Sequence, residues 1–573
     1  MAKIVIDPVT RIEGHLRLEV KIDNNVVTDA WSAGTMFRGL EIILKGRDPR
    51  EAWMYAQRIC GVCTTVHAIC SVRAVENALG IAIPENARLL RNIIEVTQFV
   101  HDHVIHFYHL HALDWVDVVS ALSADTSKTS SLQTSISDWA NNTPSYFQAV
   151  KAQLQAYVSS TQLGPFANGY WGHPAYQLSP EANLLLAAHY LEALNFQRDY
   201  VKIHTLMGGK TPHPQTYAVG GMAIPLDPTS SQSISPAKIA YMKTLAKKGV
   251  DFVNKVYLPD IKMLAKAYVG WMGVGGGTTN FLSFGDFPQD ATNPLNLLLP
   301  RGVVSNRNLA SPPTPVNQAL IKEYVAHSWY NYTGGNNAAL HPSQGQTTPA
   351  YTGPAAPFQN LDTNGKYSWL KSPRYNDQPM EVGPLARMLV AYAAGVPAVR
   401  QAINGFLTEM KQPASVLFST LGRSAARAIE TQFLAAQLSP WLDQLSARIS
   451  GGDTVACNNA KWNPASWPAN AVGWGSTEAP RGALGHWVSI VNGKIANYQC
   501  VVPTTWNGSP RDAKGQRGPF EMSVIGLKIA DPTRPIEILR TIHSFDPCMA
   551  CAVHVVDARN RPITVIANSI MRV

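Results

Sequence analysis

The stretch RICGVCTTVH at residues 58–67 contains one cysteine pair, and a second pair with the same spacing lies near the other end of the sequence. A metal site that uses both pairs requires the two ends of the chain to meet. Two residues separate Cys60 from Cys63, so both sulfurs can face one metal ion. The stretch DPCMACAVH at residues 546–554 has the same cysteine spacing and also ends in a histidine. Thiolates are soft ligands, and four of them suit zinc, an iron–sulfur cluster, nickel or copper(I). We therefore predict one continuous body whose two ends meet at a buried metal site.

The separation of the two cysteine pairs argues against a structural zinc site. A structural zinc usually takes its ligands from a short stretch, because it staples a small fold. A chain of 573 residues can bury a large core and needs no such staple. Outside the pairs, Cys70, Cys457 and Cys500 stand alone, whereas an iron–sulfur relay needs four ligands per cluster. The pattern predicts a catalytic thiolate centre, and if its chemistry is redox, the electrons leave through another polypeptide.

The composition predicts a well-packed enzyme. Hydrophobic residues make up 46% and charged residues 15% of the sequence, which suits a large core and a surface buried against a partner. The net charge is +9, but the lysines and arginines are scattered and form no nucleic-acid module, so we expect no nucleic-acid partner. No secretory signal opens the chain, and no run of about twenty apolar residues predicts a membrane span.

The periodicity predicts an α+β fold that is mainly helical. His15–Asp23 alternates apolar and polar residues, as a half-buried strand does, and Trp487–Val502 has the pattern of a hairpin that turns at Asn492-Gly493. Helical spacing predicts long helices at residues 88–122, 181–206, 236–269, 315–330 and 383–449. We expect a central bundle of long helices, with β hairpins from the N- and C-terminal regions around the buried metal site.

A run of histidines lies within the first of these predicted helices, at residues 101–111. Pairs such as His103 and His106 have the helical spacing of metal ligands. No acidic or cysteine partner completes a convincing ligand set. We interpret the run as a packed histidine cluster rather than a second metal site.

A set of motifs resembles the signatures of nickel–iron hydrogenase large subunits. Besides the two cysteine motifs, these are DPVTRIEGH at 7–15, MFRGLE at 36–41, GGKTPHP at 208–214, APRGALGH at 479–486 and VPTTWN at 502–507. The resemblance covers essentially the whole chain and is nearest to the membrane-associated respiratory uptake group. It implies the catalytic subunit of an oxidoreductase that reversibly and heterolytically oxidises H2 to protons and electrons.

The resemblance assigns the four paired cysteines to a nickel–iron centre. Cys60 and Cys548 would be terminal ligands of nickel. Cys63 and Cys551 would bridge nickel to an iron that carries CO and cyanide ligands. Four thiolates would hold the soft metal and still leave an open face for H2.

The resemblance also implies roles for charged residues around the metals. The thiolate of Cys548 would accept the proton first. Glu13 would take the proton next, because a carboxylate in a dry pocket has a raised pKa that suits a relay at neutral pH. Arg481 would reach over the open face of the metals and stabilise anionic character, with Asp102 and Asp546 as its carboxylate neighbours. Without the motifs, each of these would be interpreted as an ordinary salt-bridge residue.

Further residues would contact the cofactor by the same resemblance. His67 would donate a hydrogen bond to a bridging sulfur and so tune the metals. Pro503 and Thr504 would cradle a cyanide through backbone and hydroxyl groups, and Pro480 would also contact the cofactor.

A second ion is implied near the C-terminus. Glu41 and His554 resemble ligands of Mg2+, with the backbone carbonyl of Cys500 as the third protein ligand. The family usually has an apolar residue where Cys500 stands. A backbone contact survives that change, although the thiol is open to oxidation.

The chain continues past the histidine at which mature family members end. We therefore expect residues 1–554 to form a single catalytic domain and residues 555–573 to be a propeptide that a maturation protease removes. The expected partner is an iron–sulfur small subunit, in a heterodimer or a dimer of heterodimers, with a membrane cytochrome as acceptor. The small subunit would carry this chain to the periplasmic side of the cytoplasmic membrane, where the enzyme would be a peripheral protein.

Three rival functions remain. A quinone-reductase subunit of the same ancestry would lack the cysteine quartet. A zinc or scaffold subunit would bind zinc without turnover. A nickel enzyme of CO chemistry would share the thiolates. None of them explains Glu13, Arg481, Glu41 and the tail together.

Overall fold

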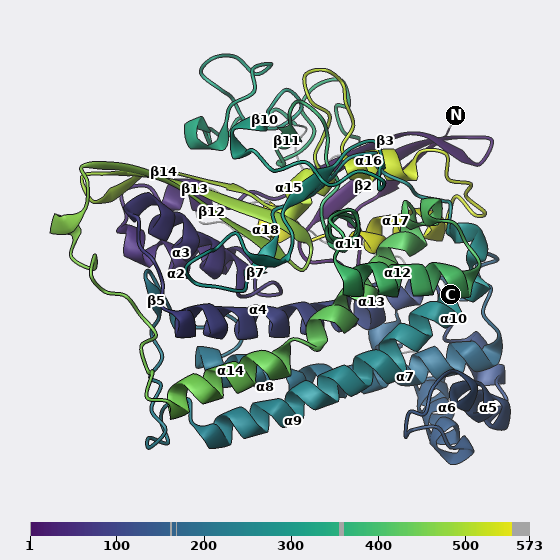
Figure 1. Cartoon of the computed structure of the whole chain (residues 1–573). Coiled ribbons are helices and arrows are strands. Elements are labelled where there is room, and N and C mark those ends of the chain that lie inside the picture. The colour runs from purple at the N-terminus through teal and green to yellow at the C-terminus, as the bar shows by residue number, and fades with distance from the viewer. Residues whose placement is uncertain (1, 161–162, 168, 354–359, 553–573) are drawn as a thin grey trace.

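Long helices form one layer of the molecule, and two three-stranded antiparallel sheets lie against it (Figure 1). The computed structural model describes residues 2–160, 163–167, 169–353 and 360–552. The first sheet comes from the N-terminal region and the second from the C-terminal region, so the predicted α+β, mainly helical arrangement is confirmed. No helix in these ranges is long and apolar enough to cross a membrane.

The centre of the helical layer is α4 (Glu85–Ile105), which is buried along nearly its whole length. A helix that is covered on every side belongs in the core of a large protein. It packs against other long helices of the layer. The principal helices are α7 (Pro180–Tyr200), α8 (Lys202–Gly208), α9 (Pro236–Phe252), α10 (Leu258–Ala267), α11 (Pro384–Ala393), α12 (Pro397–Met410), α13 (Thr420–Ala435) and α14 (Leu438–Ser450).

Two of the predicted long helices contain π-helical turns. The predicted helix 88–122 is α-helical only to Ile105 and continues as the π-helix η3 (His106–His111). The predicted helix 236–269 is divided by the π-helix η7 (Val253–Tyr257). The two π segments touch, with the rings of Phe107 and Tyr257 centred 5.4 Å apart. Such turns are frequent at functional sites.

The histidines of this region bond to protein groups. His103 Nε2 lies 2.8 Å from a carboxylate oxygen of Glu430. His106 Nε2 lies 2.7 Å from the carbonyl oxygen of His543, and His111 Nε2 lies 3.1 Å from that of Arg540. These contacts agree with a packed histidine cluster that joins the helical layer to the C-terminal region.

The N-terminal sheet has the order β1 (Ala2–Ile6), β2 (Leu16–Asp23) and β3 (Val26–Gly34). The apolar residues of β2 are buried, as predicted, but Arg17 and Glu19 between them are buried as well, so the strand is half-buried only at its end, where Lys21 and Asp23 are exposed. The C-terminal sheet has the order β12 (Asn470–Ala479), β13 (Gly482–Val491) and β14 (Lys494–Val501). Asn492 and Gly493 join β13 to β14 with positive φ angles of 49° and 75°, so the predicted hairpin and its turn are confirmed.

Two glycines bring the C-terminal sheet onto the helix that follows the first cysteine pair. This helix, α3 (Val66–Leu79), packs against β12. A Cβ atom at Gly473 would lie 2.2 Å from the carbonyl oxygen of Ala74, and one at Gly475 would lie 2.2 Å from that of Cys70. Only glycine permits this approach, which holds the start of α3 against the sheet that carries Arg481.

The predicted helix at residues 315–330 is wrong. Ile321–Tyr324 is the strand β10, which pairs in antiparallel fashion with β11 (Ser372–Tyr375). A short apolar run is ambiguous between helix and strand, and here the distant partner strand decides the outcome.

The remaining elements are short or lie at the edges. The helices are α1 (Leu40–Ile43), α2 (Ala52–Ala56), α5 (Thr126–Ile136), α6 (Pro144–Ser159), α15 (Pro503–Asn507), α16 (Pro519–Val524), α17 (Ile536–Ser544) and α18 (Met549–Ala552). The strands are β4 (Tyr217–Ala218), β5 (Gly221–Met222), β6 (Phe281–Ser283), β7 (Asp286–Pro288), β8 (Leu297–Leu299) and β9 (Gly302–Val304).

Candidate metal centre

Three of the four paired cysteines meet in the core. The sulfurs of Cys60, Cys63 and Cys548 all lie within 4.8 Å of one another, and all three residues are buried. Cys60 Sγ and Cys548 Sγ are 3.3 Å apart. Two thiolates bound to one metal at about 2.3 Å stand roughly 3–4 Å apart, so this spacing fits a shared metal. Cys551 belongs to α18 by its backbone, and its side chain lies outside the described part of the structure.

The N-terminal motif reaches the second cysteine pair through backbone contacts. The amide of Glu13 donates to the carbonyl of Pro547 at 3.3 Å, and the amide of Met549 donates to the carbonyl of Glu13 at 2.7 Å. Gly14 has a φ of 81°, and a Cβ atom there would lie 2.5 Å from the backbone nitrogen of Ala550. Glycine at this position of the motif therefore allows the two ends of the chain to touch.

Glu13 is in hydrogen-bond contact with one thiol of the cluster. The thiol of Cys548 donates to Glu13 Oε2 at 3.2 Å, and the amide of Ala550 donates to the same oxygen at 2.8 Å. Burial raises the pKa of Glu13, and the charge of the nearby Cys60 raises it further. The carboxylate is therefore more basic than an exposed glutamate and sits where it can exchange a proton with Cys548.

Arg481 is held between two buried carboxylates. It follows β12 in the sequence, and its Nη1 lies 3.1 Å from Asp102 Oδ2, while its Nε lies 3.0 Å from Asp546 Oδ1. Gln98 also donates to Asp102, at 2.5 Å. Burial raises the pKa of Asp546, which Arg481 opposes. The guanidinium is thus fixed in position beside the thiols.

His67 is oriented by a chain of hydrogen bonds that sequence reasoning missed. His67 Nδ1 lies 3.1 Å from His486 Nε2, and His486 Nδ1 lies 2.7 Å from the hydroxyl of Tyr498. That hydroxyl donates to Ser71 at 2.8 Å. His486 closes the motif at 479–486, so a signal for it was present, but nothing in the sequence linked it to His67.

A small enclosed cavity of about 10 Å³ lies at the centre of these residues. Its volume is close to that of a single water-sized sphere. The amide of Cys548 donates to the hydroxyl oxygen of Thr504 at 3.0 Å, which leaves the hydroxyl hydrogen available for another acceptor. The lining residues are Cys63, Val66, His67, Ala479, Arg481, Pro503, Thr504 and Cys548.

Pro480 is the one predicted cofactor contact that does not line this cavity. Its carbonyl instead accepts a hydrogen bond from Arg387 Nη2 at 2.9 Å. The residue therefore orders the backbone next to Arg481.

The predicted magnesium ligands are described only in part. Glu41 accepts a hydrogen bond from the amide of Cys500 at 2.8 Å and another from the hydroxyl of Thr347. Lys371 Nζ lies 4.0 Å from Glu41 and 3.5 Å from Glu323. Burial raises the pKa of Glu323 to about 7. Two buried carboxyl groups thus share one ammonium, an acidic setting that fits a divalent cation, while His554 lies outside the described residues.

The site combines buried sulfur ligands, a basic carboxylate beside one thiol and a fixed guanidinium. These groups define a thiolate-metal enzyme that can separate protons from electrons. Comparison with known proteins narrows this class. A family model described as nickel-dependent hydrogenase matches residues 38–554, and one described as HoxL-like matches residues 3–32. The chain belongs to the nickel-dependent hydrogenase family.

Similar proteins extend over the whole chain. The uptake hydrogenase large subunit of Bradyrhizobium diazoefficiens is 51% identical, over 96% of this chain and 95% of its own. The hydrogenase-1 large chain of Escherichia coli is 47% identical, over 96% and 95%. The H2-activated NiFeSe hydrogenase of Dm. baculatum has a TM-score of 0.74 and 35% identity, over 96% of this chain and 100% of that one.

Family membership settles the main expectations from the sequence. The chain is a large subunit of an uptake-type nickel–iron hydrogenase, an oxidoreductase that acts on H2. Hydrogenase large subunits work with a small subunit, which agrees with the lack of spare cysteines for an iron–sulfur relay. The zinc-scaffold and quinone-reductase alternatives are not favoured.

Proposed function

We propose that Cys548, Glu13 and Arg481 divide the work of H2 oxidation in this chain. The observation that carries the proposal is the contact of 3.2 Å between Cys548 Sγ and Glu13 Oε2, at the edge of a cluster of three buried thiols. When bound, the nickel–iron centre supplies the place where H2 is taken up and split. The chain itself removes the proton and stabilises the charge.

Proton removal begins at the thiol of Cys548. Because Glu13 Oε2 lies within hydrogen-bond distance of that sulfur, a proton on the sulfur has a direct acceptor. The raised pKa of Glu13 makes its carboxylate a better base for this transfer. The amide of Ala550 fixes the accepting oxygen, so little reorganisation accompanies the step.

Arg481 acts as a fixed positive charge above the thiols. Its two carboxylate neighbours, Asp102 and Asp546, hold the guanidinium in one orientation and prevent it from collapsing onto the sulfurs. A charge that is already oriented stabilises anionic character without reorganisation. His67, held by His486, orients the sulfur side of the same cavity.

The cavity walls support iron-bound CO and cyanide as cofactor ligands. Val66, Ala479 and Pro503 present apolar surface, whereas Thr504 and Arg481 present hydrogen-bond donors. A cyanide nitrogen accepts hydrogen bonds and a CO ligand does not, so mixed walls suit both. An infrared spectrum of the purified enzyme tests this proposal. Bands from one CO and two cyanides are expected, and a blank spectrum from a chain that ends at His554 would contradict it.

We further propose that Mg2+ binds at Glu41, the carbonyl of Cys500 and His554. The acidic cluster around Lys371 supports a divalent cation there. Metal analysis of the purified enzyme should find Mg2+ in the wild type and a reduced amount in Glu41→Gln. An unchanged Mg2+ content in the variant would contradict the site.

The small subunit is proposed to carry iron–sulfur clusters and to dock where the first cysteine pair reaches the surface. Gly61 and Val62 are exposed, although the cysteines on either side of them are buried. The loop thus links the buried thiols to the surface, where electrons can pass to a docked partner. Val62→Asp should weaken assembly of the heterodimer, as measured by co-purification, and leave the fold of the large subunit unchanged. Undiminished co-purification would place the interface elsewhere.

The remaining proposals concern assembly and location. We propose a heterodimer, which can pair into a dimer of heterodimers, and a membrane cytochrome as acceptor behind the small subunit. The enzyme would lie on the periplasmic side of the cytoplasmic membrane as a peripheral protein, exported together with its small subunit. Fractionation of cells with and without the small subunit tests this location, because loss of export without the subunit is the expected result.

Residues 1–554 are proposed to be one catalytic domain and residues 555–573 a propeptide. The family match ends at His554, which supports a cut after this residue by a maturation protease. The contacts between Glu13 and the 547–549 segment support a domain closed by its own two ends. Intact-mass analysis of active enzyme should find a chain that ends at His554, and activity in a chain that keeps the tail would contradict the proposal.

A further inference from the structure

A cavity whose lining residues lie at positions 139–252 of the chain shares none of them with the metal centre. Its volume is about 340 Å³, within the range of small-molecule sites, which is about 300–1,000 Å³. Its lining residues come from α7, α9 and the loop at residues 137–143 that joins α5 to α6. Figure 1 shows α7 and α9 side by side. Nothing in the proposed hydrogenase chemistry uses it.

Aromatic rings form the apolar wall of this cavity. Phe196 stacks between Tyr200 and Phe252, with ring centroids 5.1 Å and 4.7 Å away. Trp139 meets Phe252 edge-on at 5.9 Å. Tyr200 is buried, and its hydroxyl has no hydrogen-bond partner among the described residues. Tyr200 therefore contributes its ring to the wall, while its hydroxyl oxygen is buried.

One carboxylate in the cavity lacks a cationic partner. Glu192 accepts hydrogen bonds from Trp139 Nε1 at 2.7 Å and from the hydroxyl of Tyr146 at 2.6 Å, and both donors are neutral. No lysine or arginine ion pair with it occurs in the described ranges, and His189, one turn away, bonds to Asp260 at 2.8 Å. Glu192 is therefore a fixed negative charge that a ligand can neutralise.

The other charged groups of the lining are already paired. Asp199 pairs with Lys202 at 2.8 Å, and Asp251 pairs with Lys247 at 2.6 Å. Lys248, the one cation in the lining, lies 3.9 Å from Asp199. The charge that remains open to a ligand is thus the carboxylate of Glu192.

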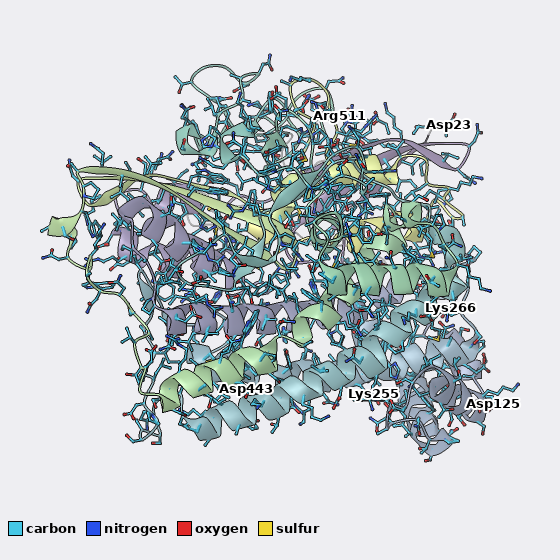
Figure 2. All side chains as sticks on the ribbon, in the orientation of Figure 1. Asp23, Asp125, Lys255, Lys266, Asp443 and Arg511 are labelled. Atoms are coloured by element: carbon cyan, nitrogen blue, oxygen red, sulfur yellow. The ribbon has the colours of Figure 1, made fainter. Side chains whose placement is uncertain are left out.

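The loop that carries Trp139 is anchored over the cavity. Asp138 pairs with Lys255 at 2.8 Å, and Figure 2 labels Lys255 on the side of the molecule where α5 and α6 lie. Trp139 is fixed in turn by its bond to Glu192. The wall and the carboxylate are therefore preorganised, which lowers the entropic cost of binding.

We propose that this cavity binds a small organic cation with an alkylated ammonium head. Aromatic rings attract such cations, and the half-buried carboxylate of Glu192 in the lining adds an opposite charge. The site is an accessory binding site of the enzyme, independent of the nickel–iron chemistry.

Isothermal titration of the purified heterodimer with choline tests the proposal, with 3,3-dimethylbutan-1-ol as a neutral probe of nearly the same shape. Choline should bind, and the alcohol should bind at least tenfold more weakly. Glu192→Gln should weaken choline binding at least tenfold and leave binding of the alcohol and H2 oxidation unchanged. Glu181→Gln is the matched control, because Glu181 lies on the same helix but outside the lining. It should leave choline binding, alcohol binding and H2 oxidation unchanged.

Several outcomes would overturn the proposal. Equal affinity for choline and the alcohol would show that the positive charge of the ligand does not contribute to binding. Full choline affinity in Glu192→Gln would show that Glu192 does not bind the ligand. Absence of binding to the wild type at millimolar choline would remove the site. If Glu192→Gln fails to fold, Asn195→Arg at the exposed rim places a competing cation in the cavity. It should abolish choline binding, and retained binding would refute the proposal.

Discussion

Replacing Glu13 by glutamine should stop proton transfer while leaving the metal centre assembled. Glutamine has nearly the same shape and keeps an oxygen that can accept from the amide of Ala550, as Glu13 does at 2.8 Å. It cannot take a proton from Cys548, whose sulfur lies 3.2 Å from the carboxylate. A positioned base contributes about 10²–10⁴-fold to rate, which corresponds to a barrier change of roughly 3–5 kcal/mol. We therefore expect H2 oxidation to fall by about 10²–10⁴-fold.

Dye reduction by H2 measures this loss, and nickel content with the infrared spectrum reports on the assembled centre. Both should be unchanged in Glu13→Gln. Asp7→Asn is the matched control, because Asp7 lies in the same motif but is exposed and pairs with Arg17 at 2.6 Å. The control should keep its activity within about twofold, because the buried Arg17 keeps its second ion pair, with Glu19 at 2.6 Å.

Two results would refute the reasoning about Glu13. A variant with intact metals and at least half of the wild-type rate would show that Cys548 passes its proton elsewhere. Loss of nickel from the variant would show that Glu13 acts in assembly of the centre. Glu13→Asp separates geometry from chemistry. Its carboxylate is one methylene shorter and cannot reach the sulfur at hydrogen-bond distance, so it should restore little of the lost rate.

Three further perturbations follow from the contacts around the centre. Arg481→Lys keeps the positive charge, but an ammonium cannot bind both Asp102 and Asp546 in the same way. Turnover of H2 should therefore fall about 10–100-fold while the infrared bands are retained. An unchanged rate would show that the fixed guanidinium is not needed. Gly14→Ala places a methyl group 2.5 Å from the backbone nitrogen of Ala550, at a residue whose φ is 81°. The free energy of unfolding, measured by urea titration, should therefore fall by about 2–4 kcal/mol. A loss below about 0.5 kcal/mol, the size expected of a surface substitution, would contradict the close contact. Glu430 is buried, which alone would raise its pKa, but Arg387 lowers that pKa to about 2. The resulting stability is present above the unfolded pKa of about 4.3 and is lost as the pH falls toward 2, so Glu430→Gln should flatten the acid limb of the unfolding curve measured against pH.

Much of the site could be predicted because its residues belong to local motifs. The cysteine spacing indicated a shared metal, and the far ends of the chain met as the pairing of motifs required. Glu13, Arg481 and Thr504 were each named from a short stretch and lie beside the thiols. Their roles came from the resemblance of these three stretches to a known family, because the residue types alone would have indicated ordinary salt-bridge or surface residues.

The errors and omissions share a different physical cause. Residues 321–324 form a strand because residues 372–375 pair with them, and no local pattern reveals that partner. His67 belongs to α3 and is oriented by His486 of β13, which lies 419 positions further along the chain. Such contacts depend on which elements are neighbours in space, which short-range periodicity does not encode.

The sequence by itself indicated a buried thiolate centre, most of the long helices and the β structure at both ends, and its family resemblance pointed to Glu13 and Arg481. Only the tertiary structure decided how those residues are oriented: the guanidinium between two carboxylates, the carboxylate on one thiol, and the aromatic cavity against α7 and α9. The physical reason is that ligand chemistry resides in side-chain type and spacing, whereas orientation, burial and pKa result from packing between elements that are distant in the chain.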